Sequence, residues 1–291
     1  MKVSKLFRKV AAIGAALAMT ATAAACGGGA DDKSITIGYI EWDEAVATSH
    51  MWKHILEEQG YDVELKALQA GLIFQGLADG EVDFYLDAWL PQTHKDYMDK
   101  YGDQVEKLGN WYGGEATLNI TVPEYVEDVN SMEDLAANAD ELGGNIIGIE
   151  QGAGLMKATE DNMIPDYGLE GKLDLKTSST PAMLTELETA YEKEEPIVVT
   201  LWHPHWAYAE YDLKDLEDPK GSMGEGETIE TLGSEDFVED HKDVADMLKK
   251  FKMSDEELAD LENFVFNKGD DEAAGAKAWL DENPDFAKTL K

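Results

Sequence analysis

The sequence predicts an α/β protein of two lobes, each a mainly parallel sheet flanked by helices. Strand-like apolar runs alternate with helical patterns, and this alternation occurs twice along the chain. It is typical of parallel sheets that carry helices on both faces. The length of 291 residues also exceeds the usual size of one domain, and 43% hydrophobic residues make two cores feasible.

The first repeat begins with residues 35–40, an apolar run with β-branched residues that suits a buried strand. A helix over 43–59 follows, because Val46, Met51 and Ile55 recur near the helical period and Gly60 closes the pattern. The remaining elements of this repeat are a strand at 63–68, a helix at 72–78 and a strand at 82–86.

The second repeat has the same order of elements. We expect strands at 145–149, 173–176 and 197–201, with helices at 155–163 and 181–192. Residues 118–122 resemble a strand that ends at Pro123, residues 213–219 lead out of the second repeat, and both are candidate hinges. The C-terminal third is helical, with a capping box from Ser254 to Glu257.

These patterns predict lobe I from residues 35–117 and 213–291, and lobe II from residues 118–212. Two lobes joined by two crossovers describe a clamshell that closes on a ligand. In such sheets the ligand binds outside the carboxyl ends of the strands.

The N-terminal segment predicts export. Basic residues precede an apolar stretch over 11–25, which small residues and Cys26 follow, as in a lipoprotein signal peptide. The stretch is shorter than the about 20 apolar residues of a spanning helix. We therefore expect a signal peptide at 1–25, a lipidated stalk at 26–34 that begins with Cys26, and an extracytoplasmic protein held at the membrane by lipid alone. Ordinary secretion with a free Cys26 is the alternative.

The charge and the cysteine count exclude several classes. A formal net charge of −37 argues against nucleic acid, because phosphate binding needs clustered Lys and Arg. One cysteine permits no disulfide within the chain. His203 and His205 are two apart and point to opposite faces of a strand, so no metal site is expected. We expect no cofactor and a monomer.

Three predicted strands lead into tryptophan: Trp42, Trp89 and Trp202 follow them closely. A single such residue would be read as a core aromatic. Three at equivalent places in a repeated architecture can converge on the cleft between the lobes. Indole faces attract a cation that offers no hydrogen bonds, namely a quaternary ammonium, by about 0.5 to 2 kcal/mol per ring.

The donors for an anion lie in two further segments. The strand over 145–149 turns through small residues into a helix, so the backbone N–H groups of Gly154 and Leu155 are free to bind an anion. His94, five residues after Trp89, supplies a further donor. The third glycine of a dinucleotide fingerprint and a Walker lysine are both absent, which argues against a nucleotide.

At these positions the chain resembles the extracytoplasmic substrate-binding proteins of glycine betaine ABC importers, over nearly the whole chain after the signal peptide. The resemblance rests on Gly38-Tyr39-Ile40-Glu41-Trp42, Asp87-Ala88-Trp89-Leu90-Pro91-Gln92-Thr93-His94, Gly152-Ala153-Gly154-Leu155 and Trp202-His203-Pro204-His205-Trp206.

The resemblance implies a type II periplasmic-binding-protein-like fold and the uptake of an osmoprotectant. It implies a prism of Trp42, Trp89 and Trp202 around the trimethylammonium group. His94 and the amides of Gly154 and Leu155 would hold the carboxylate, and the partner would be an importer permease.

Three other interpretations stay open from the residues. The ligand can be another quaternary ammonium compound, such as proline betaine, carnitine or choline, although choline has no carboxylate for His94 to bind. An extracellular hydrolase is less favoured, because the chain lacks a Gly-x-Ser-x-Gly nucleophile elbow. A surface adhesion protein could use Trp52, Trp111, Trp206 and Trp279, but Trp52 and Trp279 lie within helical patterns.

Overall fold

The computed structural model describes residues 33–290. The predicted signal peptide at 1–25, Cys26 and nearly all of the predicted stalk lie outside these described residues. Within 33–290, the longest apolar helices fall short of what a membrane crossing needs.

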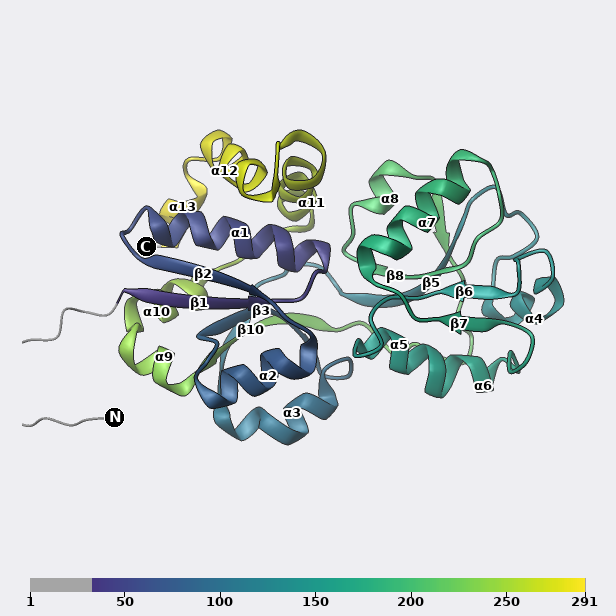
Figure 1. The fold of residues 1–291 in the computed structure, drawn as a ribbon, viewed down its shortest axis with the longest axis horizontal. Helices are drawn as coiled ribbons and strands as arrows, with labels where there is room; N and C mark the ends of the chain where they lie inside the picture. Colours follow the sequence, from purple (N-terminus) through teal and green to yellow (C-terminus); the bar gives the residue numbers. More distant parts are fainter. Residues whose placement is uncertain (1–32, 291) are drawn as a thin grey trace, which may run out of the picture. The chain divides into compact units, whose positions relative to one another are not determined.

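The first sheet has five strands in the order β2-β1-β3-β10-β4 (Figure 1). β1 pairs in parallel with β2 and β3, whereas β10 is antiparallel to both β3 and β4. The strands are β1 (Ser34–Tyr39), β2 (Asp62–Ala67), β3 (Phe84–Leu90), β4 (Val105–Asn110) and β10 (Thr228–Ser234).

The second sheet repeats this arrangement in the order β7-β6-β8-β5-β9. β6 is parallel to β7 and β8, and β5 is antiparallel to β8 and β9. Its strands are β5 (Thr117–Pro123), β6 (Asn145–Ile147), β7 (Asp174–Lys176), β8 (Val199–His203) and β9 (Leu213–Asp215). The predicted two-lobed α/β fold is confirmed, but the sheets are mixed and not mainly parallel. In each sheet two strand pairings are parallel and two are antiparallel, because the chain crosses between the lobes and returns to add antiparallel strands.

The chain crosses to the second sheet before β5 and returns to the first before β10, and these two crossing segments pair with each other. Ala116, just before β5, forms an antiparallel bridge with Glu227, just before β10. The sequence assigned residues from 213 onward to the first lobe, and this boundary is wrong for 213–215. β9 pairs with β5 and forms the edge strand of the second sheet. The chain therefore returns to the first lobe between β9 and β10.

Helices cover both faces of the first sheet (Figure 1). α1 lies on one face, with α11 and α12 beside it, whereas α2 and α3 lie on the other. The helices of this part are α1 (Asp43–Glu57), α2 (Ala70–Asp79), α3 (Lys95–Tyr101), α9 (Glu235–Asp240), α10 (Lys242–Lys250), α11 (Asp255–Asn263), α12 (Glu272–Glu282) and α13 (Phe286–Thr289), with the 3-10 turn η1 (Gly102–Gln104) and the π-helical turn η4 (Phe264–Lys268).

The second sheet is also covered on both faces, by α7 and α8 on one and by α5 and α6 on the other (Figure 1). Its helices are α4 (Leu135–Asn138), α5 (Gly154–Ala158), α6 (Ile164–Asp166), α7 (Thr180–Glu192) and α8 (Ala207–Glu210), with the 3-10 turn η2 (Met132–Asp134) and the π-helical turn η3 (Thr159–Met163). The single predicted helix at 155–163 is therefore α5 followed by η3.

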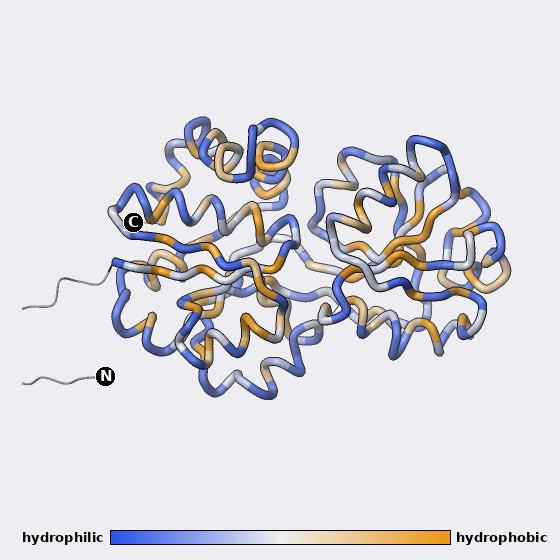
Figure 2. Tube along the Cα trace, in the orientation of Figure 1, coloured by the Kyte–Doolittle hydropathy of each residue, from blue (hydrophilic) through white to orange (hydrophobic). Residues whose placement is uncertain are grey.

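Hydrophobic residues concentrate along the central strands of each sheet, and hydrophilic residues on the outer helices (Figure 2). All seven residues of β3 are buried. The predicted strand at 82–86 was placed too early, because β3 continues through Trp89 and Leu90, which pair with Ile229 and Thr228 of β10. The predicted capping box at Ser254 and Glu257 is present at the start of α11.

Candidate ligand-binding site

Trp42 lies between β1 and α1, where its extended backbone (φ −95°, ψ 142°) makes it the N-cap residue of α1. Its side chain is buried, at 5% exposure. The indole Nε1–H donates to Glu150 Oε2 at 3.4 Å, and Glu150 follows β6 of the second sheet. Trp42, which follows a strand of the first sheet, therefore contacts a loop of the second sheet.

Trp89 is the penultimate residue of β3, the central strand of the first sheet. Side chains two apart on a strand point to the same face, so Trp89 and Asp87 lie together. The indole Nε1–H of Trp89 donates to Asp87 Oδ1 at 2.8 Å. Both side chains are buried.

Trp202 has the equivalent place in the second sheet, as the penultimate residue of the central strand β8. Its indole Nε1–H donates to Glu44 Oε2 at 3.0 Å, and Glu44 belongs to the first turn of α1. The ring centroids of Trp202 and Trp42 are 6.2 Å apart and tilted by 51°. The two tryptophans from different sheets thus meet.

His94 is fully buried and stacks on Trp42, with ring centroids 5.7 Å apart and planes 8° from parallel. The backbone N–H of Trp89 donates to His94 Nδ1 at 2.9 Å, which places the imidazole proton on Nε2. His94 Nε2 has no hydrogen-bond partner within residues 33–290. Burial lowers the pKa of His94 to about 3, so the ring is a neutral donor.

Gly154 and Leu155 are the first two residues of α5, where backbone N–H groups have no partner within the helix. A Cβ atom on Gly154 would lie 2.4 Å from the carbonyl oxygen of Thr93. Only glycine allows this approach, which brings the start of α5 to the turn that precedes His94. Leu155 itself is buried at 2% exposure.

The structure therefore brings Trp42, Trp202 and His94 into direct ring contact. Trp89 joins them through its backbone bond to His94, and Gly154 joins through Thr93. Two cavities flank this cluster. One of about 480 Å³ is lined by Trp42, Glu150 and residues 151–153, and one of about 320 Å³ by Thr93, Gly154 and Lys157 of α5.

The sequence reasoning missed the acidic residues of this cluster. Glu44 and Asp87 are fully buried and accept hydrogen bonds from Trp202 and Trp89. Glu44 Oε1 and Asp87 Oδ2 have no hydrogen-bond partner within the described part of the chain. The spacing of Asp87 and Trp89 on one strand could have indicated their contact.

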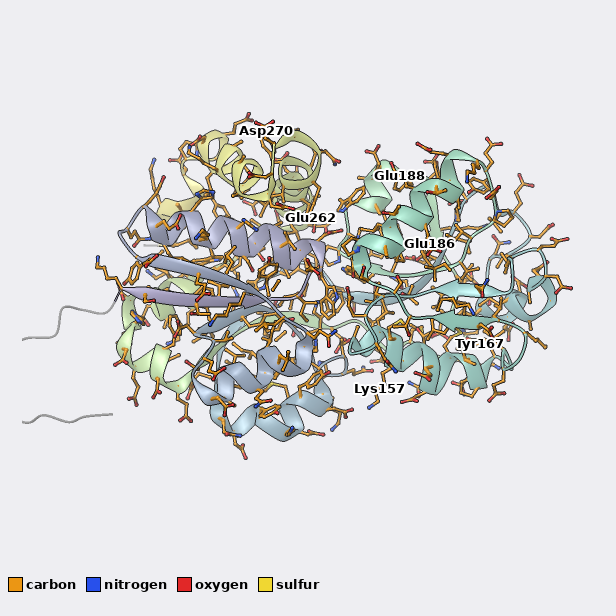
Figure 3. All side chains as sticks on the ribbon, viewed as in Figure 1. Lys157, Tyr167, Glu186, Glu188, Glu262 and Asp270 are labelled. Carbon is orange, nitrogen blue, oxygen red and sulfur yellow. The ribbon has the colours of Figure 1, made fainter. Side chains whose placement is uncertain are left out.

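Burial is the main influence on these carboxyl groups. The pKa of Glu44 is raised to about 8, mainly by burial and also by the neighbouring Asp43. Contacts with Trp202 and Trp89 oppose the shift by favouring the carboxylate. Burial also raises the pKa of Asp87 and of Glu262, which comes from α11 (Figure 3). A cation in this cluster would favour the charged form of all three.

His203, the last residue of β8, and His205, two residues later, have separate partners. His203 Nε2 is 2.8 Å from Asp215 Oδ2, and His205 Nε2 is 3.0 Å from Asp43 Oδ2. Over residues 33–290 we find no group of three His, Cys, Asp or Glu side chains that could hold a metal ion.

Residues 33–282 match the family OpuAC, described as the substrate binding domain of ABC-type glycine betaine transport systems. The glycine betaine/carnitine transport binding protein GbuC of Listeria monocytogenes is 40% identical over 147 residues, which are 50% of this chain and 48% of that protein. The chain thus matches about half the length of this curated relative.

Two solved structures align over most of their length. The glycine/betaine/L-proline-binding protein ProX of Borrelia burgdorferi has a TM-score of 0.82 and 31% identity, over 88% of this chain and 96% of that chain. Lactococcal OpuAC in its closed-liganded conformation complexed with glycine betaine has a TM-score of 0.81 and 34% identity, over 89% and 100%.

The likeness to these structures agrees with the two-lobed, type II periplasmic-binding-protein-like fold expected from the sequence. The family consists of transport substrate-binding proteins and not of enzymes, as the sequence predicted. The chain belongs to the OpuAC family, the substrate-binding domains of ABC-type glycine betaine transport systems.

Proposed function

We propose that this protein is the extracytoplasmic substrate-binding subunit of an ABC importer that captures glycine betaine for osmoprotection. Trp42, Trp89 and Trp202 form a cage around the trimethylammonium group. His94 Nε2–H and the backbone amides of Gly154 and Leu155 bind the carboxylate.

One observation carries this proposal: a cluster of aromatic rings contains both an unpaired buried donor, His94 Nε2, and an unpaired buried carboxyl oxygen, Glu44 Oε1. Opposite polarities in one site suit a zwitterion. The methylated nitrogen of betaine has no N–H to donate, so ring faces hold it without leaving a polar group unpaired. The carboxylate needs donors, which a neutral histidine and helix-start amides supply.

The buried carboxyl groups favour choline as the second candidate. Choline is a net cation without a carboxylate, so Glu44 and Asp87 attract it and nothing in it repels them. His94 separates the two candidates, because only the carboxylate of a betaine would accept its Nε2–H.

The test is a thermal-shift panel of glycine betaine, proline betaine, carnitine, choline and proline on the purified chain, followed by calorimetry. A ligand that binds only the native state raises the unfolding midpoint. We expect glycine betaine to give the largest shift, and His94→Ala to weaken betaine about tenfold or more while sparing choline. A panel in which none of the quaternary ammonium compounds shifts the midpoint would contradict the proposal.

We also propose that Cys26 carries a lipid that holds this binding domain, as a monomer, beside its permease. A tether raises the effective concentration of the domain at the importer. Cys26→Ala should release a protein that still binds betaine but supports uptake poorly. Membrane fractionation and transport assays on the two forms measure this, and an unchanged membrane-bound fraction would argue against the anchor.

A further inference from the structure

Each tryptophan of the proposed cage donates its indole N–H to a different carboxyl group. Trp42 Nε1 donates to Glu150 Oε2 at 3.4 Å, Trp89 Nε1 to Asp87 Oδ1 at 2.8 Å, and Trp202 Nε1 to Glu44 Oε2 at 3.0 Å. The acids come from a loop of the second sheet, from β3 and from α1. Three separate elements thus place an acid at the edge of a cage ring.

Two of these acids are held where an isolated charge is unfavourable. Glu44 and Asp87 have no exposed surface, and each accepts a hydrogen bond from an indole N–H group, which carries no charge. Their second oxygens have no partner within residues 33–290. A buried carboxylate with so little compensation gains strongly from a cation nearby.

Glu150 is arranged differently. It is half-buried, and besides Trp42 it accepts hydrogen bonds from the backbone N–H and the hydroxyl of Thr180, at 2.8 and 3.2 Å. Thr180 opens α7, a helix of 13 residues whose N-terminus stabilises a negative charge. The carboxylate of Glu150 is thus supported, and its effect on the cage should be the smallest of the three.

The position of the acids at the ring edges has a chemical consequence. An indole face attracts a cation because the ring carries a negative quadrupole, with its positive pole at the edge. A carboxylate that accepts the N–H lies at this positive edge, where hydrogen bonding polarises the ring and adds negative potential at its face. The same charges repel the carboxylate of a zwitterion, which orients that end toward His94.

We propose that Glu44, Asp87 and Glu150 are specificity-determining residues, whose charges behind the three indoles select a permanently cationic head group over an uncharged one of the same shape. This rests on the proposed function, in which the cage holds a trimethylammonium group. Glu44 should have the largest effect of the three. It is fully buried, and from α1 of the first lobe it accepts the indole N–H of Trp202 of the second.

The test compares two ligands that differ in one atom. Glycine betaine carries N(CH₃)₃⁺, and 3,3-dimethylbutanoate carries the uncharged C(CH₃)₃ in the same place. Calorimetry on the full chain at pH 9, above the pKa of Glu44, measures both dissociation constants. Their ratio is that of 3,3-dimethylbutanoate divided by that of glycine betaine. Choline and 3,3-dimethylbutanol form a second pair that lacks the carboxylate.

We expect Glu44→Gln to lower this ratio about tenfold, by weakening betaine and sparing 3,3-dimethylbutanoate. Glutamine keeps the shape and an acceptor oxygen, so the charge alone changes. Asp87→Asn should act in the same direction, and Glu150→Gln more weakly. The matched control is Asp260→Asn, because Asp260 accepts the indole N–H of Trp279 at 3.0 Å and Trp279 is not part of the cage. Its ratio should equal that of the wild type.

The outcomes separate the two proposals. If Glu44→Gln and Glu150→Gln weaken both members of each ligand pair equally, the acids merely position the rings and the inference is overturned. If the wild-type protein binds neither betaine nor choline, the proposed function itself fails. The unfolding midpoint of each variant shows whether it is folded, and Glu150→Gln tests the inference even if a change at a fully buried acid prevents folding.

Discussion

The central strands of the two sheets, β3 and β8, carry Trp89 and Trp202 at equivalent places but hold their indole N–H groups differently. The partner of Trp89 is Asp87 of the same strand. The partner of Trp202 is Glu44 of α1, which packs on the other sheet. The orientation of Trp89 is therefore set within its own lobe, whereas that of Trp202 depends on contact between the lobes.

Trp42 also depends on contact between the lobes, but here the tryptophan belongs to the first lobe and its partner to the second. It lies at the start of α1, and its partner Glu150 follows β6 of the second sheet. The two lobes thus exchange acceptors: Glu44 of the first holds Trp202 of the second, and Glu150 of the second holds Trp42 of the first. From this difference we expect the Trp89 wall of the proposed cage to be preformed within one lobe, and closure of the lobes to orient Trp42 and Trp202.

The largest effect, on the free energy of unfolding, should come from truncating Trp89, the tryptophan held within its own lobe. Trp89→Ala should lower the free energy of unfolding by about 3 to 5 kcal/mol, because it leaves a cavity within one lobe. Trp202→Ala should lower it by less, since its N–H partner belongs to the other lobe. Both should weaken betaine binding by about 1 to 3 kcal/mol.

Denaturant unfolding without ligand measures the first quantity, and calorimetry measures the second. Equal losses of stability in the two variants would show that Trp202 is fixed within its own lobe and would break the comparison.

The difference between contacts within a lobe and contacts between lobes also explains which features the sequence could predict. The alternation of strands and helices predicted both sheets, because a buried strand and an amphipathic helix leave local patterns in hydrophobicity. The boundary at 213 failed, since β9 has only three residues and its membership is decided by pairing with β5, which is not a local property.

For the site, the sequence predicted that Trp42, Trp202 and His94 converge, and their rings are in contact, while their role in binding stays a prediction. The Asp87 to Trp89 contact was also accessible, because it follows from the two-residue period of a strand. The contacts of Glu44 and Glu150 were not. They join residues 158 and 108 positions apart, and they arise only from how the lobes meet.

A second pair of tryptophans sharpens the contrast outside the cage. Trp206 of the second lobe donates its Nε1–H to Asp43 of α1 at 2.7 Å, whereas Trp279 and Asp260 both belong to the C-terminal helices. Trp206→Phe keeps an aromatic ring but loses this hydrogen bond between the lobes, so we expect betaine affinity to fall about tenfold.

Trp279→Phe is the matched variant. It should reduce the free energy of unfolding by about 1 kcal/mol and leave the affinity unchanged. Calorimetry and denaturant unfolding on both variants decide the matter. A loss of affinity in Trp279→Phe as large as in Trp206→Phe would contradict a role for the contact between lobes.

The acceptor of Trp202 should also make binding depend on pH. Burial raises the pKa of Glu44 to about 8 in the ligand-free protein, with the acids Asp43, Asp87 and Glu262 around it. A bound cation favours the carboxylate, so binding releases a proton below pH 8. Betaine affinity should then rise with pH by up to about tenfold per unit and level off above pH 8.

Calorimetry in buffers of different ionisation enthalpy counts the released protons, and Glu44→Gln should flatten the profile. The stability of the ligand-free protein has the opposite slope. The folded state binds more protons than the unfolded state between the ordinary carboxyl pKa and about 8, so the contribution of Glu44 to stability falls as pH rises through that window. An affinity independent of pH between 6 and 8 would show that Glu44 does not respond to the ligand.

The smallest effect should come from an exposed contact between the lobes. Lys157 of α5 forms an ion pair with Asp96 of α3, and both side chains are largely in solvent. Surface pairs contribute little, so Lys157→Ala should weaken betaine by no more than about threefold. The control is Lys95→Ala, because Lys95 pairs with Asp99 inside α3 and does not reach the other lobe.

Salt should separate the two variants further. Screening removes the contribution of an exposed pair, so wild type and Lys157→Ala should converge in affinity as salt is raised toward about 1 M. The wild-type affinity itself should fall only mildly, because betaine is net neutral. The buried indole to carboxylate bonds should persist, since screening hardly reaches them. A steep loss of wild-type affinity with salt would instead place the main contact between the lobes at their surface, and not at the three tryptophans.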